Sequence, residues 1–152
     1  MQGMAENSEL AYQSEFDGIY VHACGTGFHN QLMSAGTLSL GFSATAMHYI
    51  SKKPCQIVDH IHMVGANSTE RAKFEEQALK DWNSILLARA KELRIGGRFI
   101  CINFGIDENG QFLGNTGGHS MFERFRYHWF QQLKQGIITE DEFISATFPQ
   151  HY

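Results

Sequence analysis

Two glycines and an aromatic residue near the start of the chain have the spacing of a nucleotide-binding turn. Gly25-Thr26-Gly27 matches the first part of a dinucleotide-binding fingerprint, but Asn30 stands where the third glycine is required. A tight turn is therefore the favoured interpretation of these glycines. Phe28 follows directly and has a ring that could stack on a flat ligand ring or pack in the core.

Two further stretches have residue types that bind ions. His60 and His62 have a His-x-His spacing, which would place both rings on one side of a strand. No cysteine or carboxylate cluster completes a metal site with them, so no metal is predicted. Gly114 to Gly118 is a glycine-rich loop before a helix, where backbone amides could hold an anion, but it lacks the lysine of a phosphate loop. A plain connection is favoured there.

The periodicity of apolar residues indicates which elements must position these groups. Strands are predicted over 19–24, 37–43 and 98–105, and helices over 44–51, 69–93, 121–135 and shortly after 139. A helical turn or two is also predicted over 28–33. Capping boxes at Asn67 and Thr139 indicate where two of these helices begin. Gly96-Gly97 predicts a left-handed stop to the long helix.

The order of these elements is that of an α/β fold with crossover connections. The strand over 98–105 is apolar almost throughout, which predicts a parallel sheet covered by helices on both faces. Ligands of such sheets bind outside the carboxyl ends of the strands. His48 and Tyr49 follow the strand over 37–43 and are hydrogen-bond donors there, so they are the best placed candidates for binding, although both could simply pack.

Composition excludes several function classes. The chain has 152 residues, 12 Lys and Arg against 16 Asp and Glu, and no basic tract, so no nucleic-acid partner is predicted. No apolar run is long enough for a membrane span, and the first residues do not form a signal peptide. Cys24, Cys55 and Cys101 are widely spaced, which is typical of reduced thiols. We therefore expect a cytoplasmic protein with a loose segment over 1–18 and one domain over 19–152.

Four segments, in order, resemble the SABATH methyltransferases, which methylate carboxyl groups of small acids and, in some members, ring nitrogens. The segments are Gly27 to Ser34, Ser39 to Pro54, Asp81 to Gly97 and Gly136 to Tyr152. The second resembles the family's H-F-V-x-S-S-x-S-L-H/M-W-L-S-x-x-P, and the third its D-F-x-x-F-L-x-x-R-x-x-E-L-x-x-G-G. The resemblance covers residues 19–152.

The resemblance implies a fold, a cofactor and site residues. The fold would be a partial Rossmann-like class I methyltransferase sheet with flanking helices, incomplete at the N-terminal strands and the helical cap. The cofactor would be S-adenosylmethionine and the substrate a small carboxylic acid. Gly27 and Phe28 fall where the family holds adenine, and the substrate positions fall on Thr45, His48, Tyr49, Met121 and Phe122. Ile144 to Thr147 replace the family's proposed magnesium ligands, so no metal is implied.

The implied mechanism requires orientation rather than proton transfer. A carboxylate is already ionised at neutral pH, so no general base and no catalytic residue are predicted. The protein has only to place one carboxylate oxygen in line with the sulfonium methyl group.

The segments that would hold the rest of the cofactor have no counterpart in the sequence. We therefore expect a fragment or truncated form that is inactive alone, with the strand over 37–43 open on one edge, which favours a homodimer. Whether the chain is an enzyme stays open. One alternative is a different α/β enzyme with nucleotide contacts at Gly25, Gly27 and Phe28. Another is a non-catalytic pseudoenzyme or interaction module.

Overall fold

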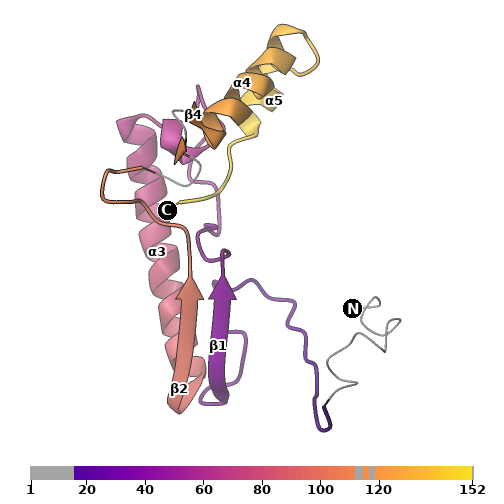
Figure 1. The fold of residues 1–152 in the computed structure, drawn as a ribbon, viewed down its shortest axis with the longest axis vertical. Coiled ribbons are helices and arrows are strands. Elements are labelled where there is room, and N and C mark those ends of the chain that lie inside the picture. Colours follow the sequence, from indigo (N-terminus) through magenta and orange to yellow (C-terminus); the bar gives the residue numbers. More distant parts are fainter. Residues whose placement is uncertain (1–15, 112–114, 117–118, 152) are drawn as a thin grey trace.

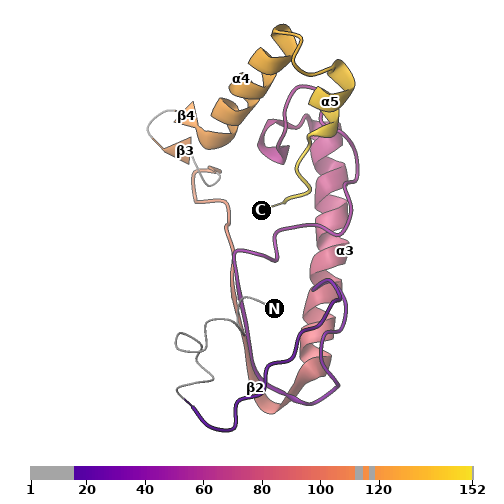
Figure 2. The same cartoon turned by 90° about the vertical axis from the view of Figure 1, so that its right-hand side faces the viewer.

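A two-stranded parallel sheet and one long helix form the main body of the protein. The computed structural model describes residues 16–111, 115–116 and 119–151. Strands β1 (Leu38–Ala44) and β2 (Leu93–Ile102) are parallel, and helix α3 (Ser68–Glu92) runs beside them on one face (Figure 1; Figure 2). The fold is therefore α/β, as predicted. None of the helices in the described ranges is both long and apolar enough to cross a membrane.

A smaller layer of helices lies beyond the carboxyl ends of the two strands (Figure 1). It contains the short hairpin of β3 (Asn115–Thr116) and β4 (His119–Ser120), followed by α4 (Met121–Lys134) and α5 (Glu140–Ser145). The capping box of Thr139 and Glu142 opens α5 as predicted. The rest of the glycine-rich stretch over 114–118 lies outside the described residues.

Helix α3 begins at the predicted capping box, and its buried face is more polar than the apolar periodicity predicts. The Asn67 side chain accepts hydrogen bonds from the amides of Thr69 and Glu70 at 3.0 and 2.9 Å. Trp82 and Leu86 are exposed, although they follow Phe74 at the spacing of one helix face. Five of the seven buried residues of the helix are polar, the seven being Glu70, Phe74, Gln77, Asp81, Ile85, Arg89 and Glu92. Several of these polar groups bind loops, as described below.

The long helix ends before the two glycines that were predicted to terminate it. The helix ends at Glu92, and β2 begins at the next residue, so Gly96 and Gly97 lie inside the strand. Gly96 adopts φ +77°, a left-handed conformation that suits glycine. A Cβ on Gly97 would lie 2.7 Å from the Leu38 carbonyl oxygen. The two glycines thus permit an irregular register and a close approach of β1, rather than a helix cap.

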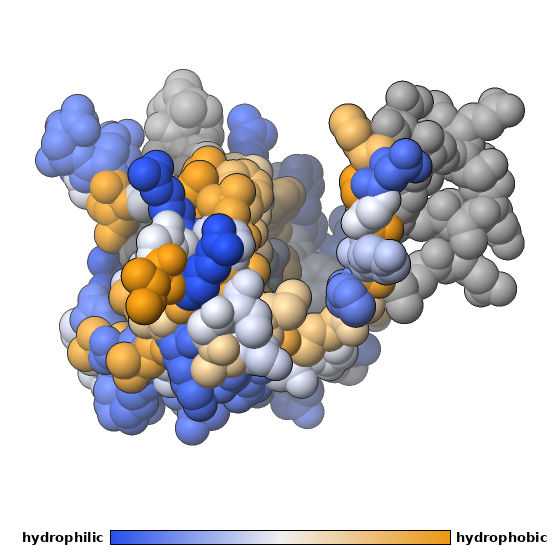
Figure 3. Space-filling view, turned by 90° about the horizontal axis from the view of Figure 1, so that it is seen from below, coloured by the Kyte–Doolittle hydropathy of each residue, from blue (hydrophilic) through white to orange (hydrophobic). Residues whose placement is uncertain are grey.

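Among the described residues, a helix covers only one face of the sheet (Figure 2), which corrects the prediction of helices on both. Side chains alternate along β2, so every second apolar residue points away from α3. Leu40, Phe42, Ile100 and Ile102 are exposed on the strands, Phe42 by 65%. Figure 3 shows hydrophobic and hydrophilic residues mixed on the face that is seen from below. Within the described ranges, β1 pairs with β2 alone, so the other edge of β1 is open. A homodimer that forms through this edge stays a prediction.

Three short elements predicted near the start of the chain are absent from the described residues. Residues 19–25 are exposed and belong to no helix or strand, and 27–30 form a turn closed by the Asn30 amide and the Gly27 carbonyl at 3.0 Å. The predicted helix over 44–51 is replaced by turns and a β-bridge between Tyr49 and Gln150. Such short segments form a strand or helix only when tertiary contacts support it.

The hydrophobic core joins the irregular segment over 50–66 to the first half of α3. Its buried members are Ile50, Ile57, Met63, Ala66 and Phe74. This core fixes the chain that follows β1 against the helix. It thereby positions His48 and Tyr49 at the carboxyl end of the sheet.

Candidate functional site

A cavity of about 550 Å³ opens at the carboxyl ends of the two strands. The segment after β1, one face of α3, the residues after β2 and His151 line it. Its volume falls within the range of small-molecule sites. Its apolar lining residues are Met47, Ile50, Ala78, Leu79, Trp82 and Phe104.

A few polar side chains converge on this apolar cavity. His48 is buried and its ring lies 4.7 Å from that of Tyr49 and 5.4 Å from that of Phe104. Burial lowers the pKa of His48, and a hydrogen bond with the Asn103 side chain opposes part of that fall. The imidazole is therefore neutral at pH 7, with one donor and one acceptor nitrogen. Tyr49 is half-exposed and can present its hydroxyl to a ligand.

Asp81 holds the loop that presents Tyr49. Its carboxylate accepts hydrogen bonds from the amide and the hydroxyl of Ser51 at 2.7 and 2.8 Å. Gln77 donates a third at 2.9 Å. These bonds fix the chain two residues after Tyr49 to α3, which gives the cavity one rigid wall. The sequence reasoning did not assign Asp81 to the site, although the residue begins one of the quoted motifs.

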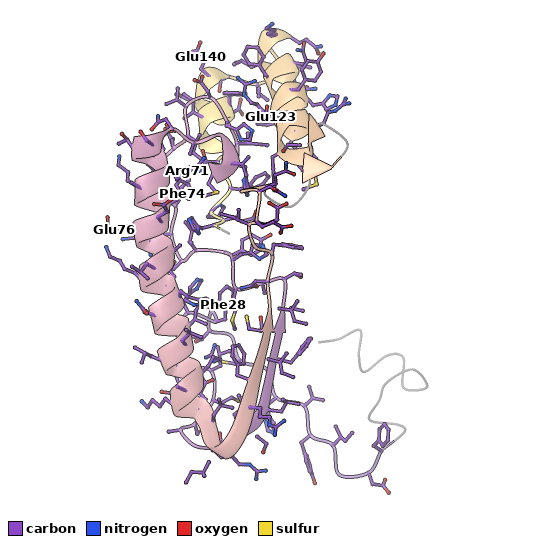
Figure 4. The ribbon with its side chains drawn as sticks, turned by 60° about the vertical axis from the view of Figure 1, so that its left-hand side comes forward. Phe28, Arg71, Phe74, Glu76, Glu123 and Glu140 are labelled. Atoms are coloured by element: carbon purple, nitrogen blue, oxygen red, sulfur yellow. The ribbon has the colours of Figure 1, made fainter. Side chains whose placement is uncertain are left out.

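The predicted cofactor residues lie next to the predicted substrate residues. The rings of Phe28 and His29 are stacked, with centroids 4.3 Å apart. His29 Nε2 donates a hydrogen bond to the Tyr49 carbonyl oxygen at 3.0 Å. Figure 4 shows Phe28 between α3 and the strands. His29 was not among the predicted site residues, yet it connects the predicted cofactor residues with the predicted substrate residues.

The remaining predicted residues lie outside the cavity lining. Thr45 is exposed with φ +53°, and its amide donates to the Ile102 carbonyl oxygen at 2.7 Å. Met121 is exposed at the start of α4. Phe122 is buried and stacks on His62 at 3.7 Å. Their roles in substrate binding stay predictions.

The His-x-His pair is part of a buried packing cluster. His60 Nδ1 accepts a hydrogen bond from the His62 amide at 2.9 Å, and His60 Nε2 lies 3.6 Å from the Glu123 carboxylate. In the described part of the chain, no group of three suitable side chains could hold a metal ion. Burial lowers the pKa of His62 to about 4, against a hydrogen bond with Gln150, and the nearby His60, His48 and His151 lower it further.

This depressed pKa predicts a loss of stability in acid. Between pH 6.5 and 4 the unfolded chain protonates His62 while the folded chain does not, so the folded state weakens as pH falls. The difference corresponds to about 3 kcal/mol. Urea unfolding at pH 7 and pH 4.5 should show that His62→Gln reduces the pH dependence. His22→Gln, at an exposed histidine, is the control and should leave it unchanged.

Comparisons with known proteins agree on one family. Residues 2–152 match the family profile described as SAM dependent carboxyl methyltransferase. Loganic acid O-methyltransferase of Catharanthus roseus is 22% identical over 134 residues, which is 82% of this chain and 36% of that enzyme. A solved structure of loganic acid methyltransferase with SAH superposes with a TM-score of 0.76 at 19% identity, over 95% of this chain and 44% of that one.

The chain thus spans less than half the length of these two relatives. The structural likeness confirms the predicted fold, and the family profile confirms the resemblance drawn from the four motifs. The cofactor on which the family depends is S-adenosylmethionine, as the resemblance implied. Because the profile matches nearly the whole sequence, the chain belongs to the SAM-dependent carboxyl methyltransferase family.

Proposed function

We propose that the protein containing this chain transfers a methyl group to the carboxylate of a small acid held in the cavity. The observation that carries the proposal is the row of contacts from Phe28 to His48. The Phe28 ring stacks on His29, His29 donates a hydrogen bond to the Tyr49 carbonyl oxygen, and the Tyr49 ring lies beside that of His48. This row joins the residues that the family resemblance assigns to cofactor and to substrate. It starts at the turn over 27–30 and ends in the cavity wall.

The described residues fit the adenine end of S-adenosylmethionine. Phe28 offers an aromatic ring for stacking, and a Cβ on Gly27 would meet only His29, at 4.0 Å, so the backbone there is open to a flat ligand. When bound, the cofactor supplies an electrophilic methyl group on a sulfonium. The residues of this chain would hold its adenine.

The cavity suits a mainly apolar acid. Its apolar lining would bury the body of the molecule, and the Tyr49 hydroxyl and a neutral His48 would donate to the carboxylate. The acid is ionised at neutral pH, so neither residue has to remove a proton. Their role is to orient one oxygen and to exclude water, which together lower the barrier by several kcal/mol.

Methyl transfer by the complete protein tests this function. Incubation with radiolabelled S-adenosylmethionine and a panel of small acids that includes loganic acid should give a methyl ester. A product methylated on nitrogen, or no product with any acid, would contradict the proposal.

We further propose that residues 1–152 alone bind the cofactor weakly, because the contacts that we assign to it in the described part of the chain hold its adenine end. Isothermal titration of the isolated chain with S-adenosylmethionine should give no micromolar binding. The complete protein is the control and should bind. Micromolar binding by the isolated chain would overturn this part of the proposal.

A further inference from the structure

A buried ion pair lies near the end of α3, away from the cavity lining. Arg89 is 3% exposed and Glu92 is 1% exposed. The guanidinium meets the carboxylate through two hydrogen bonds, Nε to Oε2 and Nη2 to Oε1, each 2.7 Å long. This two-point contact fixes the orientation of both side chains.

The same pair holds the chain around Phe28, some sixty residues earlier in the sequence. Arg89 donates to the carbonyl oxygens of Phe28 and Asn30, at 2.9 and 2.8 Å. Glu92 Oε1 accepts hydrogen bonds from the amides of Leu32 and Met33, the latter at 3.1 Å. Four backbone groups within six residues are thus bound to one pair.

Residues 28–33 have no secondary structure that would position them otherwise. They follow an exposed segment that has no helix or strand, and they lie in turns, bends and irregular chain. His29 adds a hydrogen bond to the Tyr49 carbonyl oxygen, at the other side of the site. The ion pair and His29 together therefore determine where Phe28 stands relative to the cavity.

A buried ion pair is by itself weak support for stability, because desolvating two charges offsets most of their attraction. Burial raises the pKa of Glu92, but hydrogen bonds from Arg89 and from the Leu32 and Met33 amides outweigh it and leave the pKa lowered. The carboxylate is therefore ionised at neutral pH. It can hold two amides at once, which an apolar replacement could not do.

We propose that the Arg89–Glu92 pair positions Phe28 for cofactor binding, acting through the backbone of residues 28–33 without touching the cofactor. This inference rests on the proposed function, which assigns Phe28 to the adenine. It adds two positioning residues on a helix that also carries a wall of the acid cavity. Loss of the pair should then reduce the affinity for the cofactor more than it reduces the stability of the folded protein.

Hydrogen exchange and cofactor affinity in the complete protein test the inference. Glu92→Gln should speed exchange of the Leu32 and Met33 amides and weaken binding of S-adenosylhomocysteine about tenfold. In the Phe28→Ala background, the same substitution should change the affinity less than about twofold, because the pair acts through Phe28. If Glu92→Gln does not fold, Arg89→Lys, which keeps the positive charge, takes its place.

Glu70→Gln is a matched control on the same helix. Glu70 is also a buried carboxylate that accepts two backbone amides, those of Asn67 and Val58, at 2.9 and 3.2 Å. It should leave exchange over 28–33 and the affinity unchanged. Unchanged affinity in Glu92→Gln, or additive losses with Phe28→Ala, would overturn the inference alone. A wild-type protein that does not bind S-adenosylhomocysteine would overturn both it and the proposed function.

Discussion

Replacing Tyr49 by phenylalanine is expected to lower kcat/KM of the proposed methyl transfer to an acid about 10- to 100-fold in the complete protein. The hydroxyl is the only group removed. A hydrogen bond from it to a charged carboxylate contributes about 1.5–3 kcal/mol, which corresponds to this loss of rate. Tyr49 is 44% exposed, and its ring keeps its place on His48 in the variant, so the fold should be unaffected. Initial rates of ester formation at saturating S-adenosylmethionine measure the effect.

Tyr49→Trp is the informative control for this prediction. The indole N–H can replace the hydroxyl as donor, and the motif that this segment resembles has tryptophan at that position. Its kcat/KM should stay within about threefold of the wild type, since it removes no donor. If the phenylalanine variant were as active as the tryptophan variant, the hydroxyl would have no part in holding the carboxylate.

Elements whose signals are local in sequence were predicted well. The capping boxes at Asn67 and Thr139 need only residues three positions apart, and both form. The strand predicted over 19–24 does not form, because a strand needs a partner and none is paired with it in the described part of the chain. Gly96 has the predicted left-handed conformation but lies inside β2, because the strand begins directly after Glu92 and not after the glycines.

The site was predicted only in part, because some of its residues act through contacts that are distant in sequence. His48 and Tyr49 follow a strand, a position that favours ligand binding whatever the partners are. His29 and Asp81 act through hydrogen bonds to Tyr49 and Ser51, which lie twenty and thirty residues away. Asp81 lies on the long helix, and the periodicity of apolar residues does not indicate that its side chain binds the loop at Ser51. The quoted helix motif contained Asp81, Arg89 and Glu92, and it was the one signal that could have found them.

The second large effect is expected at the centre of the core, where Phe74→Ala should lower the free energy of unfolding by about 3–5 kcal/mol. Phe74 is fully buried among Ile50, Ile57, Met63 and Ala66, so the truncated side chain leaves a cavity. A domain has about 5–15 kcal/mol of stability in total, so the loss is large. Urea unfolding of the variant and the wild type at pH 7 measures it.

Leu87→Ala is the control, because Leu87 lies on the same helix and is 71% exposed. It should change the free energy of unfolding by less than about 0.5 kcal/mol. The comparison also tests how the site is held, since the core attaches residues 50–66 to α3 directly after Tyr49. Phe74→Ala should therefore raise KM for the acid even where the protein stays folded. A variant with reduced stability and an unchanged KM would show that Asp81 holds the cavity wall at Tyr49 without help from the core.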